Sequence, residues 1–283
     1  MGFLLHIFGH LLGRLPLRLQ RAMGDLLGYI GHFLLPSRRK IAHHNLAKAF
    51  PDKSEEEIKR LTQAHFCHVG CVIIDLFSMP AMSCKHLREK KLVFSGLEML
   101  QEMKVTNKGG LFLSAHMGSW ETLCTSPSMG YDVYVLYKTQ SSYFEDLIMS
   151  LRTSCGLKLF PNDHEGLKAL MHCAYDGGMV AMLADQGRKG KSYDFFGYPA
   201  RFPIGAAAFH IRHKLKAFPV FSIRQPDGRV HVTVHPPIEI DMKKKRPEKE
   251  KEFQEKYIKI LEQEIAKTPE QYYWLHDIWR DFK

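Results

Sequence analysis

The spacing of apolar residues along the chain changes near residue 92. Before that point they recur every three or four positions, as they do along one face of a helix. This pattern predicts a helix over residues 37–50 and a second helix that runs to about Pro80. Ser54 and Glu57 have the spacing of a capping box, which marks the start of the second helix. The first third of the chain is therefore predicted to be helical.

After residue 92, short apolar runs without alternation replace this spacing. They are residues 110–115, 133–137, 179–184 and 217–223. Unbroken runs of this length are typical of strands that helices cover on both faces. A turn at Gln225–Gly228 followed by Val230–Val234 predicts a returning strand, and apolar residues around Leu261 predict a last helix. We therefore expect an α/β fold, with a single mixed, mostly buried sheet flanked by helices and a helical N-terminal extension.

Residues 1–35 are rich in Leu and Phe but are interrupted by charged residues. The interruptions are Arg14, Arg18, Arg21 and Asp25. No uninterrupted run reaches the roughly 18–20 apolar residues that cross a bilayer, and the first cation follows the apolar stretch, unlike in a cleavable signal peptide. Apolar clusters that alternate with Arg predict an amphipathic helix lying in a membrane interface. A helix hairpin that caps the core is the alternative.

Composition and charge narrow the possible classes of protein. The 283 residues are 45% apolar and 11% aromatic, which supplies a full core and argues against a disordered chain or a disulfide miniprotein. Forty Lys and Arg against thirty Asp and Glu give a net charge of +10. This excess predicts attraction to anions such as phosphorylated lipids, an acidic carrier protein or nucleic acid. Six cysteines without a CxxC pair are typical of a reduced intracellular protein.

A histidine follows the predicted strand at residues 110–115, in the segment HMGSWE. Ligands and reacting groups of open α/β sheets gather where strands end, so His116 is a candidate catalytic residue. Glu121, five positions later, would complete a histidine–carboxylate pair for general base catalysis. Spacing alone also allows a strand-end histidine with only local hydrogen bonds.

Other charged and polar candidates lie near the ends of the predicted strands. Asp185 and Gln186 follow the strand at 179–184, and Lys138 follows the strand at 133–137. Arg152 offers a fork of donors to a phosphate or a developing oxyanion. A group of cations, expected to surround the mouth of an anionic substrate site, comprises Arg188, Lys189, Lys191 and Arg201.

Several of these segments, taken in their order along the chain, resemble the motifs of a known protein family. HMGSWE looks like the H-x4-D/E motif of the glycerolipid acyltransferase superfamily, and the chain as a whole resembles the bacterial lipid A biosynthesis acyltransferases, the late lauroyl and myristoyl transferases. The segments that carry the resemblance are residues 45–51, 114–121, Tyr137-Lys138, Arg152-x3-Gly156, Leu183–Gln186, residues 195–205, Pro226–Gly228 and Pro269–His276. The resemblance implies a membrane-interface helical segment at 1–40 and an acyltransferase domain at 41–283.

The resemblance also implies a reaction. A fatty acyl chain would pass from an acyl carrier protein or CoA thioester to a hydroxyl of a membrane glycolipid, most simply a lipid A precursor in late secondary acylation. His116 would be the general base and Glu121 its orienting partner, with Arg152, Asp185, Gln186, Lys138 and Arg188 binding substrate. No metal, cofactor or nucleic acid is expected, and the implied location is the cytoplasmic face of a bacterial inner membrane.

Two departures from the family pattern concern the acceptor. Lys138 stands where the family commonly has Arg, and Asp277 and Asp281 interrupt the usual basic C-terminal run. Another glycolipid or an aminolipid is therefore an alternative acceptor, and hydrolysis of the thioester is an alternative reaction. The segment His65-Phe-Cys-His68-x2-Cys71 holds metal-capable side chains, but one helix rarely encloses a metal ion alone.

Overall fold

A computed structural model describes residues 2–106, 108–137, 143–187 and 190–280. Its first part is helical, as predicted. The helices are α1 (Gly2–Arg14), α2 (Leu17–Leu34), α3 (Pro36–Ala49) and α4 (Glu55–Phe77). The capping box is confirmed: the Glu57 N–H donates to Ser54 Oγ at 3.3 Å, and the Ser54 N–H donates to Glu57 Oε2 at 2.8 Å.

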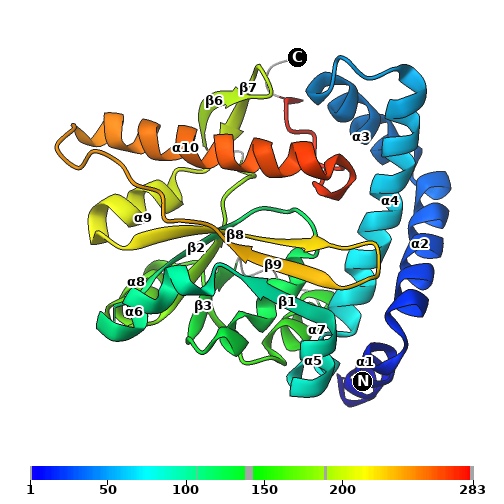
Figure 1. Ribbon diagram of the computed structural model, residues 1–283, viewed down its shortest axis with the longest axis horizontal. Helices are drawn as coiled ribbons and strands as arrows, with labels where there is room; N and C mark the ends of the chain where they lie inside the picture. The colour runs from blue at the N-terminus through cyan, green and yellow to red at the C-terminus, as the bar shows by residue number, and fades with distance from the viewer. Residues whose placement is uncertain (1, 107, 138–142, 188–189, 281–283) are drawn as a thin grey trace.

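Helices α2 and α4 lie side by side along one edge of the molecule (Figure 1). Their contact is made by glycines. A Cβ atom on Gly70 would lie 2.1 Å from the carbonyl oxygen of Gly24, and one on Gly28 would lie 2.1 Å from the carbonyl oxygen of Phe66. The two backbones approach this closely because no side chain separates them.

The described strands confirm the predicted α/β class. Seven of them form one sheet in the order β1-β9-β8-β2-β5-β3-β4, in which all neighbours are parallel except β8 and β9. Their bounds are β1 Leu92–Ser95, β2 Gly110–Ser114, β3 Val133–Tyr137, β4 Lys158–Pro161, β5 Met179–Leu183, β8 Lys216–Arg224 and β9 Val230–Val234. The runs predicted at 110–115, 133–137, 179–184 and 217–223 are β2, β3, β5 and β8, and the predicted returning strand is β9.

Helices cover both faces of this sheet. On one face Leu111 and Leu113 of β2 join a core with Phe253 and Tyr257 of α10, which lies above the sheet in Figure 1. On the other face Phe112 joins a second core. The covering elements of the first face are α8 (His164–Tyr175), α9 (Gly205–His213) and α10 (Arg246–Lys267). Those of the second face include η1 (Met79–Ser83), η2 (Leu97–Leu100), α6 (Gln101–Thr106) and η3 (Trp120–Met129).

Four described elements near this framework complete the part of the fold that matters for the site. They are α5 (Lys85–Lys91), α7 (Tyr143–Thr153), η4 (Pro269–Gln271) and an antiparallel hairpin of β6 (Lys191–Phe195) and β7 (Tyr198–Phe202). The apolar pattern did not predict the hairpin or the short strands β1 and β4. Phe195 and Phe202 of the hairpin are fully buried, and the Phe195 ring lies 6.0 Å from that of Trp279 near the C-terminus.

Candidate active site

Two adjacent parallel strands bring His116 and Asp185 together. His116 lies two residues beyond β2 and Asp185 two residues beyond β5, and Ser114 is in register with Leu183. The Asp185 carboxylate accepts two hydrogen bonds of 3.0 Å, one from the His116 backbone N–H and one from ring atom Nδ1. Since an ionised carboxylate only accepts, Nδ1 carries the proton and Nε2 carries the lone pair.

The surroundings of His116 have opposing effects on its pKa. Burial lowers the pKa of the imidazole, whereas the charge and hydrogen bond of Asp185, with a smaller contribution from Glu121, raise it. The carboxylates prevail, and the pKa lies above its ordinary value of 6.5. The rings of Trp120 and Tyr273 flank the imidazole at 5.8 and 6.2 Å between centroids. Neither aromatic residue was a candidate from sequence, although Tyr273 lies in the C-terminal segment that carries the family resemblance.

Glu121 is bound to Arg152 and not to His116. Arg152 Nε donates to Glu121 Oε2 at 2.8 Å, its Nη2 donates to Oε1 at 2.6 Å, and Trp120 Nε1 donates to Oε1 at 3.2 Å. The expectation that Glu121 orients His116 is therefore corrected, and Asp185 makes that contact. The physical reason is topological: β5 adjoins β2, so its end reaches the imidazole directly, while Glu121 lies on η3 beside α7.

The remaining predicted site residues are only partly placed. Gln186 follows Asp185, and its Nε2 is buried with no hydrogen-bond partner in the described part of the chain. Lys138 and Arg188 lie outside the described residues, as does Lys189. Of the other cations expected at the mouth, Lys191 pairs with Glu250 of α10 at 2.8 Å and Arg201 donates to the Gly190 carbonyl at 3.2 Å.

A cavity of about 1180 Å³ adjoins the catalytic candidates. Its walls include His116, Trp120, Glu121 and Arg152, and its volume exceeds the roughly 300–1,000 Å³ of pockets for drug-sized ligands. Both faces of the sheet contribute to its apolar lining. One face supplies Phe112, Val135 and Ala181, and the other supplies Leu136, Val180 and Met182. Leu183, the last residue of the interior strand β5, is 41% exposed because this hollow adjoins it.

The two histidines among the metal-capable side chains of α4 have other partners. Burial lowers the pKa of His65 to about 4 and that of His68 to about 3, so both imidazoles are neutral. His65 Nδ1 bonds to the Glu270 carbonyl at 3.0 Å, and His68 Nε2 bonds to the Gly118 carbonyl at 3.0 Å. Among the described residues no three or more His, Cys, Asp or Glu side chains are grouped as metal ligands.

Helices α1 and α2 expose many apolar side chains. They are Leu4, Ile7, Phe8, Leu11, Leu19, Leu26, Leu27, Tyr29, Ile30, Phe33 and Leu34. We call this set the N-terminal apolar face. Part of α2 packs on α4, as expected of a helix that caps the core, while the N-terminal apolar face stays exposed. In the described ranges no helix is both long and apolar enough to cross a membrane.

A histidine bound to a carboxylate beside a large apolar cavity, at the carboxyl edge of an α/β sheet, is the arrangement expected of an enzyme that acts on long-chain substrates by acid–base chemistry. Comparisons with known proteins identify the family. The sequence model of the bacterial lipid A biosynthesis acyltransferases matches residues 1–281, and the chain belongs to this family.

Characterised relatives are similar at low identity over most of their length. The lipid A biosynthesis palmitoleoyltransferase of Escherichia coli K12 is 22% identical over 275 residues, which cover 93% of this chain and 85% of the relative. The lauroyltransferase of the same organism is 23% identical over 279 residues, covering 93% and 86%. The lipid A biosynthesis acyltransferase 2 of Shigella flexneri is 25% identical over 259 residues, covering 87% and 79%.

Proposed function

We propose that this protein transfers a fatty acyl chain from a carrier thioester to a hydroxyl group of a membrane glycolipid, most simply a lipid A precursor. The contact of Asp185 with both the backbone and the ring of His116, beside a cavity of about 1180 Å³, carries the proposal. Family membership supports both the reaction class and the acceptor class. Late secondary acylation is the step at which we expect the enzyme to act.

In the proposed reaction His116 Nε2 accepts the proton of the acceptor hydroxyl as its oxygen attacks the thioester carbonyl. A carbon–oxygen bond forms, and the carbonyl oxygen becomes an oxyanion. Collapse of this intermediate breaks the carbon–sulfur bond, and the leaving thiolate takes the proton from the imidazolium. Asp185 stabilises the imidazolium between these two steps, because its carboxylate is hydrogen-bonded to Nδ1.

Arg152 lies at the cavity wall and is held in place by Glu121, so it is our candidate for binding a charged group of the substrate. Glu121 occupies its Nε and Nη2, so the fork of donors expected from sequence is already used within the protein. Nη1 is the guanidinium nitrogen that Glu121 does not engage. We assign it to the oxyanion or to a phosphate of the substrate, with Glu121 fixing the plane of the guanidinium.

The net charge and the exposed apolar residues support our proposals for the acyl donor and for the membrane surface that the protein binds. An acyl carrier protein is acidic, and the net charge of +10 favours its approach, although CoA carries anionic phosphates as well. The N-terminal apolar face includes Phe33 at 57% exposure, and Arg14 and Arg18 lie within the same two helices. We propose that this face binds the cytoplasmic surface of a bacterial inner membrane from one side.

The proposal is tested by acyl transfer in vitro, read by mass spectrometry. Acyl carrier protein and CoA thioesters of several chain lengths serve as donors, with a lipid A precursor and total membrane lipid as acceptors. We expect wild type to add the mass of one acyl chain to the precursor. The rate of this transfer should fall by about 10²- to 10⁴-fold in His116→Ala. Acylation of another lipid alone would replace the acceptor, free fatty acid without acylated lipid would indicate a hydrolase, and full activity in His116→Ala would exclude the mechanism.

A further inference from the structure

The segment between His116 and Glu121 is held by hydrogen bonds along its backbone. The His116 carbonyl accepts from the Tyr273 N–H at 2.8 Å, and the Gly118 N–H donates to the Gln271 carbonyl at 2.7 Å. The Ser119 N–H donates to the Ser222 carbonyl at 2.6 Å. We call residues 117–120 the site loop. Its path sets the distance and orientation between His116 and Glu121, the carboxylate that holds Arg152.

The site loop follows a path that Gly118 alone permits. Gly118 has φ +59°, and a Cβ atom there would lie 2.0 Å from the Ser222 carbonyl oxygen. The backbone therefore lies against β8, and it is held on its other side by His68 of α4, whose Nε2 donates to the Gly118 carbonyl. Because burial keeps His68 neutral, this hydrogen bond does not depend on pH in the ordinary range.

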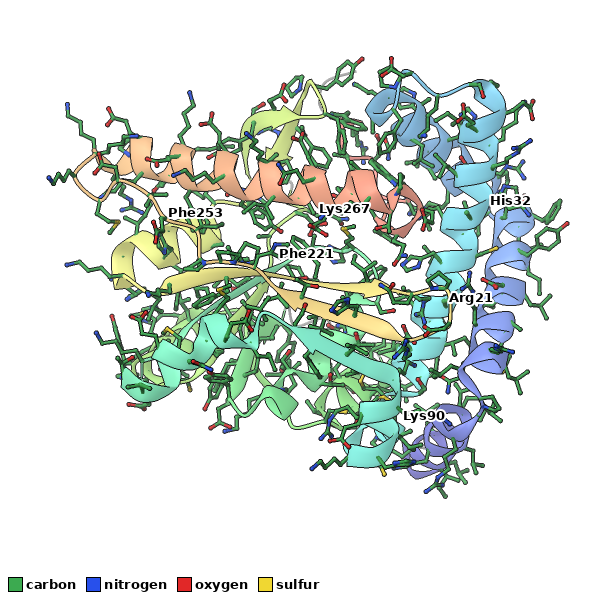
Figure 2. The ribbon with its side chains drawn as sticks, viewed as in Figure 1. Arg21, His32, Lys90, Phe221, Phe253 and Lys267 are labelled. Atoms are coloured by element: carbon green, nitrogen blue, oxygen red, sulfur yellow. The ribbon has the colours of Figure 1, made fainter. Side chains whose placement is uncertain are left out.

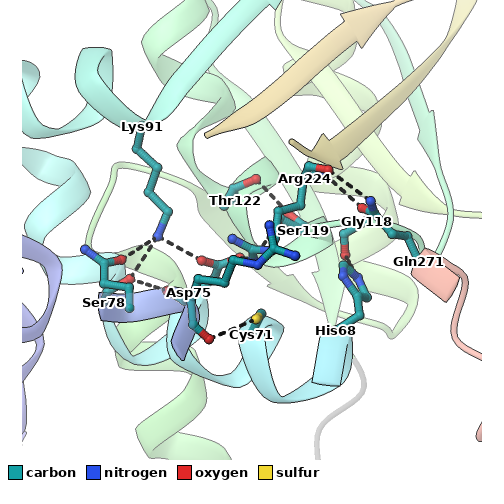
Figure 3. Close-up of polar contacts among 12 residues, drawn as sticks. His68, Cys71, Asp75, Ser78, Lys91, Gly118, Ser119, Thr122, Arg224 and Gln271 are labelled. Atoms are coloured by element: carbon teal, nitrogen blue, oxygen red, sulfur yellow. Dashed lines mark hydrogen bonds and ion pairs between the residues drawn. The ribbon is translucent and has the colours of Figure 1, made fainter. Parts of the chain in front are cut away.

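One charged side chain, with only 9% of its surface exposed, reaches the loop. Arg224, at the end of β8, donates from Nη2 to Ser119 Oγ at 2.6 Å, and the same nitrogen binds the Asp75 carboxylate of α4 (Figure 3). Lys91 binds the other oxygen of Asp75 at 2.8 Å. Asp75 and Lys91 are only 2% and 1% exposed, and Ser119 is fully buried.

This cluster holds two cations and one carboxylate, of which Asp75 and Lys91 are buried and Arg224 is 9% exposed. Burial acts to raise the pKa of Asp75, but Arg224 and Lys91 lower it to about 2, so the carboxylate stays ionised. Lys91 also donates to Gln20 Oε1 at 3.1 Å and to Ser78 Oγ at 3.4 Å. Asp75 thus has a partner on each side, and Lys91 alone still compensates its charge if Arg224 is replaced.

We propose that Arg224, held by Asp75, is a positioning residue for acyl transfer, and that it acts through Ser119 to fix the site loop. In this role Arg224 does not contact the substrate. It affects the reaction by fixing the distance and orientation between His116 and Glu121. The inference rests on the proposed function, because it assigns that distance and orientation a role in the transfer step. A displacement of the loop by about 1 Å is enough to cost a reaction up to about 10²-fold.

The test compares three single variants and one double variant of the full chain. Ser119→Ala removes the acceptor of Arg224, and Arg224→Gln removes the donor while Lys91 keeps Asp75 paired. Ser78→Ala is the matched control: it is the same substitution, at an equally buried hydroxyl that also accepts from a cation of the cluster, but away from the loop. Kinetic constants and thermal unfolding are measured for each.

We expect Ser119→Ala and Arg224→Gln to lower kcat by about tenfold to about 10²-fold, with KM for the acyl donor within about twofold. The double variant, which combines Ser119→Ala with Arg224→Gln, should have the kcat of Arg224→Gln, since both changes break the same contact. Ser78→Ala should keep kcat within about twofold of wild type while it lowers the unfolding temperature. A merely structural role would move stability in all three and leave kcat of the folded enzyme unchanged.

Three results would overturn the inference. One is a kcat for Ser119→Ala and Arg224→Gln equal to that of Ser78→Ala, and another is a double variant whose losses multiply. Both leave the proposed function intact if wild type transfers acyl chains and His116→Ala does not. The third is a wild type without any transfer, which removes the proposed function itself and this inference with it.

Discussion

The carboxylate of Asp185 binds His116 twice, once at the backbone N–H and once at ring atom Nδ1, and both contacts are 3.0 Å long. The first contact fixes where the residue lies and the second fixes how its ring is turned. A single carboxylate therefore sets the position and the tautomer of the candidate base. The pairing is possible because β2 and β5 are parallel neighbours that end at the same level.

Replacing Asp185 should change both the rate and its pH dependence. His116 must be neutral to accept a proton, so kcat/KM falls as pH drops below its pKa, which in wild type lies above 6.5. Asp185→Asn removes the negative charge that raises this pKa and leaves burial, which lowers it. We expect the acid limb of the profile to move to lower pH and kcat to fall by about 10²- to 10⁴-fold. An unmoved acid limb would show that another group titrates.

Arg152 should be irreplaceable by lysine. A lysine ammonium keeps the charge but cannot bind both oxygens of Glu121 and still direct a donor to the cavity. If its Nη1 stabilises the oxyanion, Arg152→Lys lowers kcat by about 10²- to 10³-fold. Arg229→Lys is the control, since Arg229 pairs with Asp227 at the surface of the β8–β9 turn. Equal activities for the two variants would contradict the assignment.

Charge placed on the N-terminal apolar face should prevent binding to lipid surfaces. Phe33→Glu puts a carboxylate among the exposed apolar residues near the C-terminal end of α2 and should reduce sedimentation with anionic phospholipid vesicles by about tenfold or more. Val105→Glu on α6 is the matched control, because Val105 is 86% exposed but belongs to another surface. Equal loss in both variants would mean that added charge alone weakens binding, and no loss in either would exclude this face.

The contact between α2 and α4 should tolerate no added carbon at Gly70. A Cβ there meets the Gly24 carbonyl oxygen at 2.1 Å, so Gly70→Ala must separate two backbones, and we expect a loss of about 1–3 kcal/mol in the free energy of unfolding. Gly31→Ala is the control on the same pair of helices. Its Cβ would meet Phe66 at an ordinary 3.7 Å, so we expect it to be neutral or stabilising by up to about 1 kcal/mol. Denaturant unfolding measures both values.

The sequence predicted the elements that an apolar pattern defines. It located β2, β3, β5 and β8 from short unbroken apolar runs, and β9 from the turn that precedes it. It missed the β6–β7 hairpin, in which buried Phe195 and Phe202 alternate with charged residues such as Asp194 and Arg201. The Phe195 ring packs near those of Tyr272 and Trp279, which lie more than 70 residues away from it in the sequence.

The sequence named several residues that the structure places at the candidate site, but not the way in which they pair, and it did not name Trp120 or Tyr273. His116 and Asp185 were both expected at strand ends, yet only the order of strands in the sheet brings them together. Glu121 was predicted to pair with His116 because the two residues are close in sequence. In the structure Glu121 instead binds Arg152 of α7. The buried cluster around Asp75 could not be predicted, since a charged residue within a helical pattern ordinarily faces water.

The glycine contact between α2 and α4 has a consequence for how the enzyme meets its acceptor. Backbones in direct contact collide if they slide or tilt, so we expect the apolar face of α2 and the loop that His68 binds from α4 to move together. Figure 2 shows Arg21 and His32 on α2, which runs beside α4 for much of its length. If the N-terminal apolar face binds a lipid surface, as we propose, the height of His116 above that surface is a fixed dimension of the protein. In the proposed reaction we then expect acylation only of a hydroxyl whose own depth in the lipid matches that height, so that the fold would select where on the acceptor the new chain is attached.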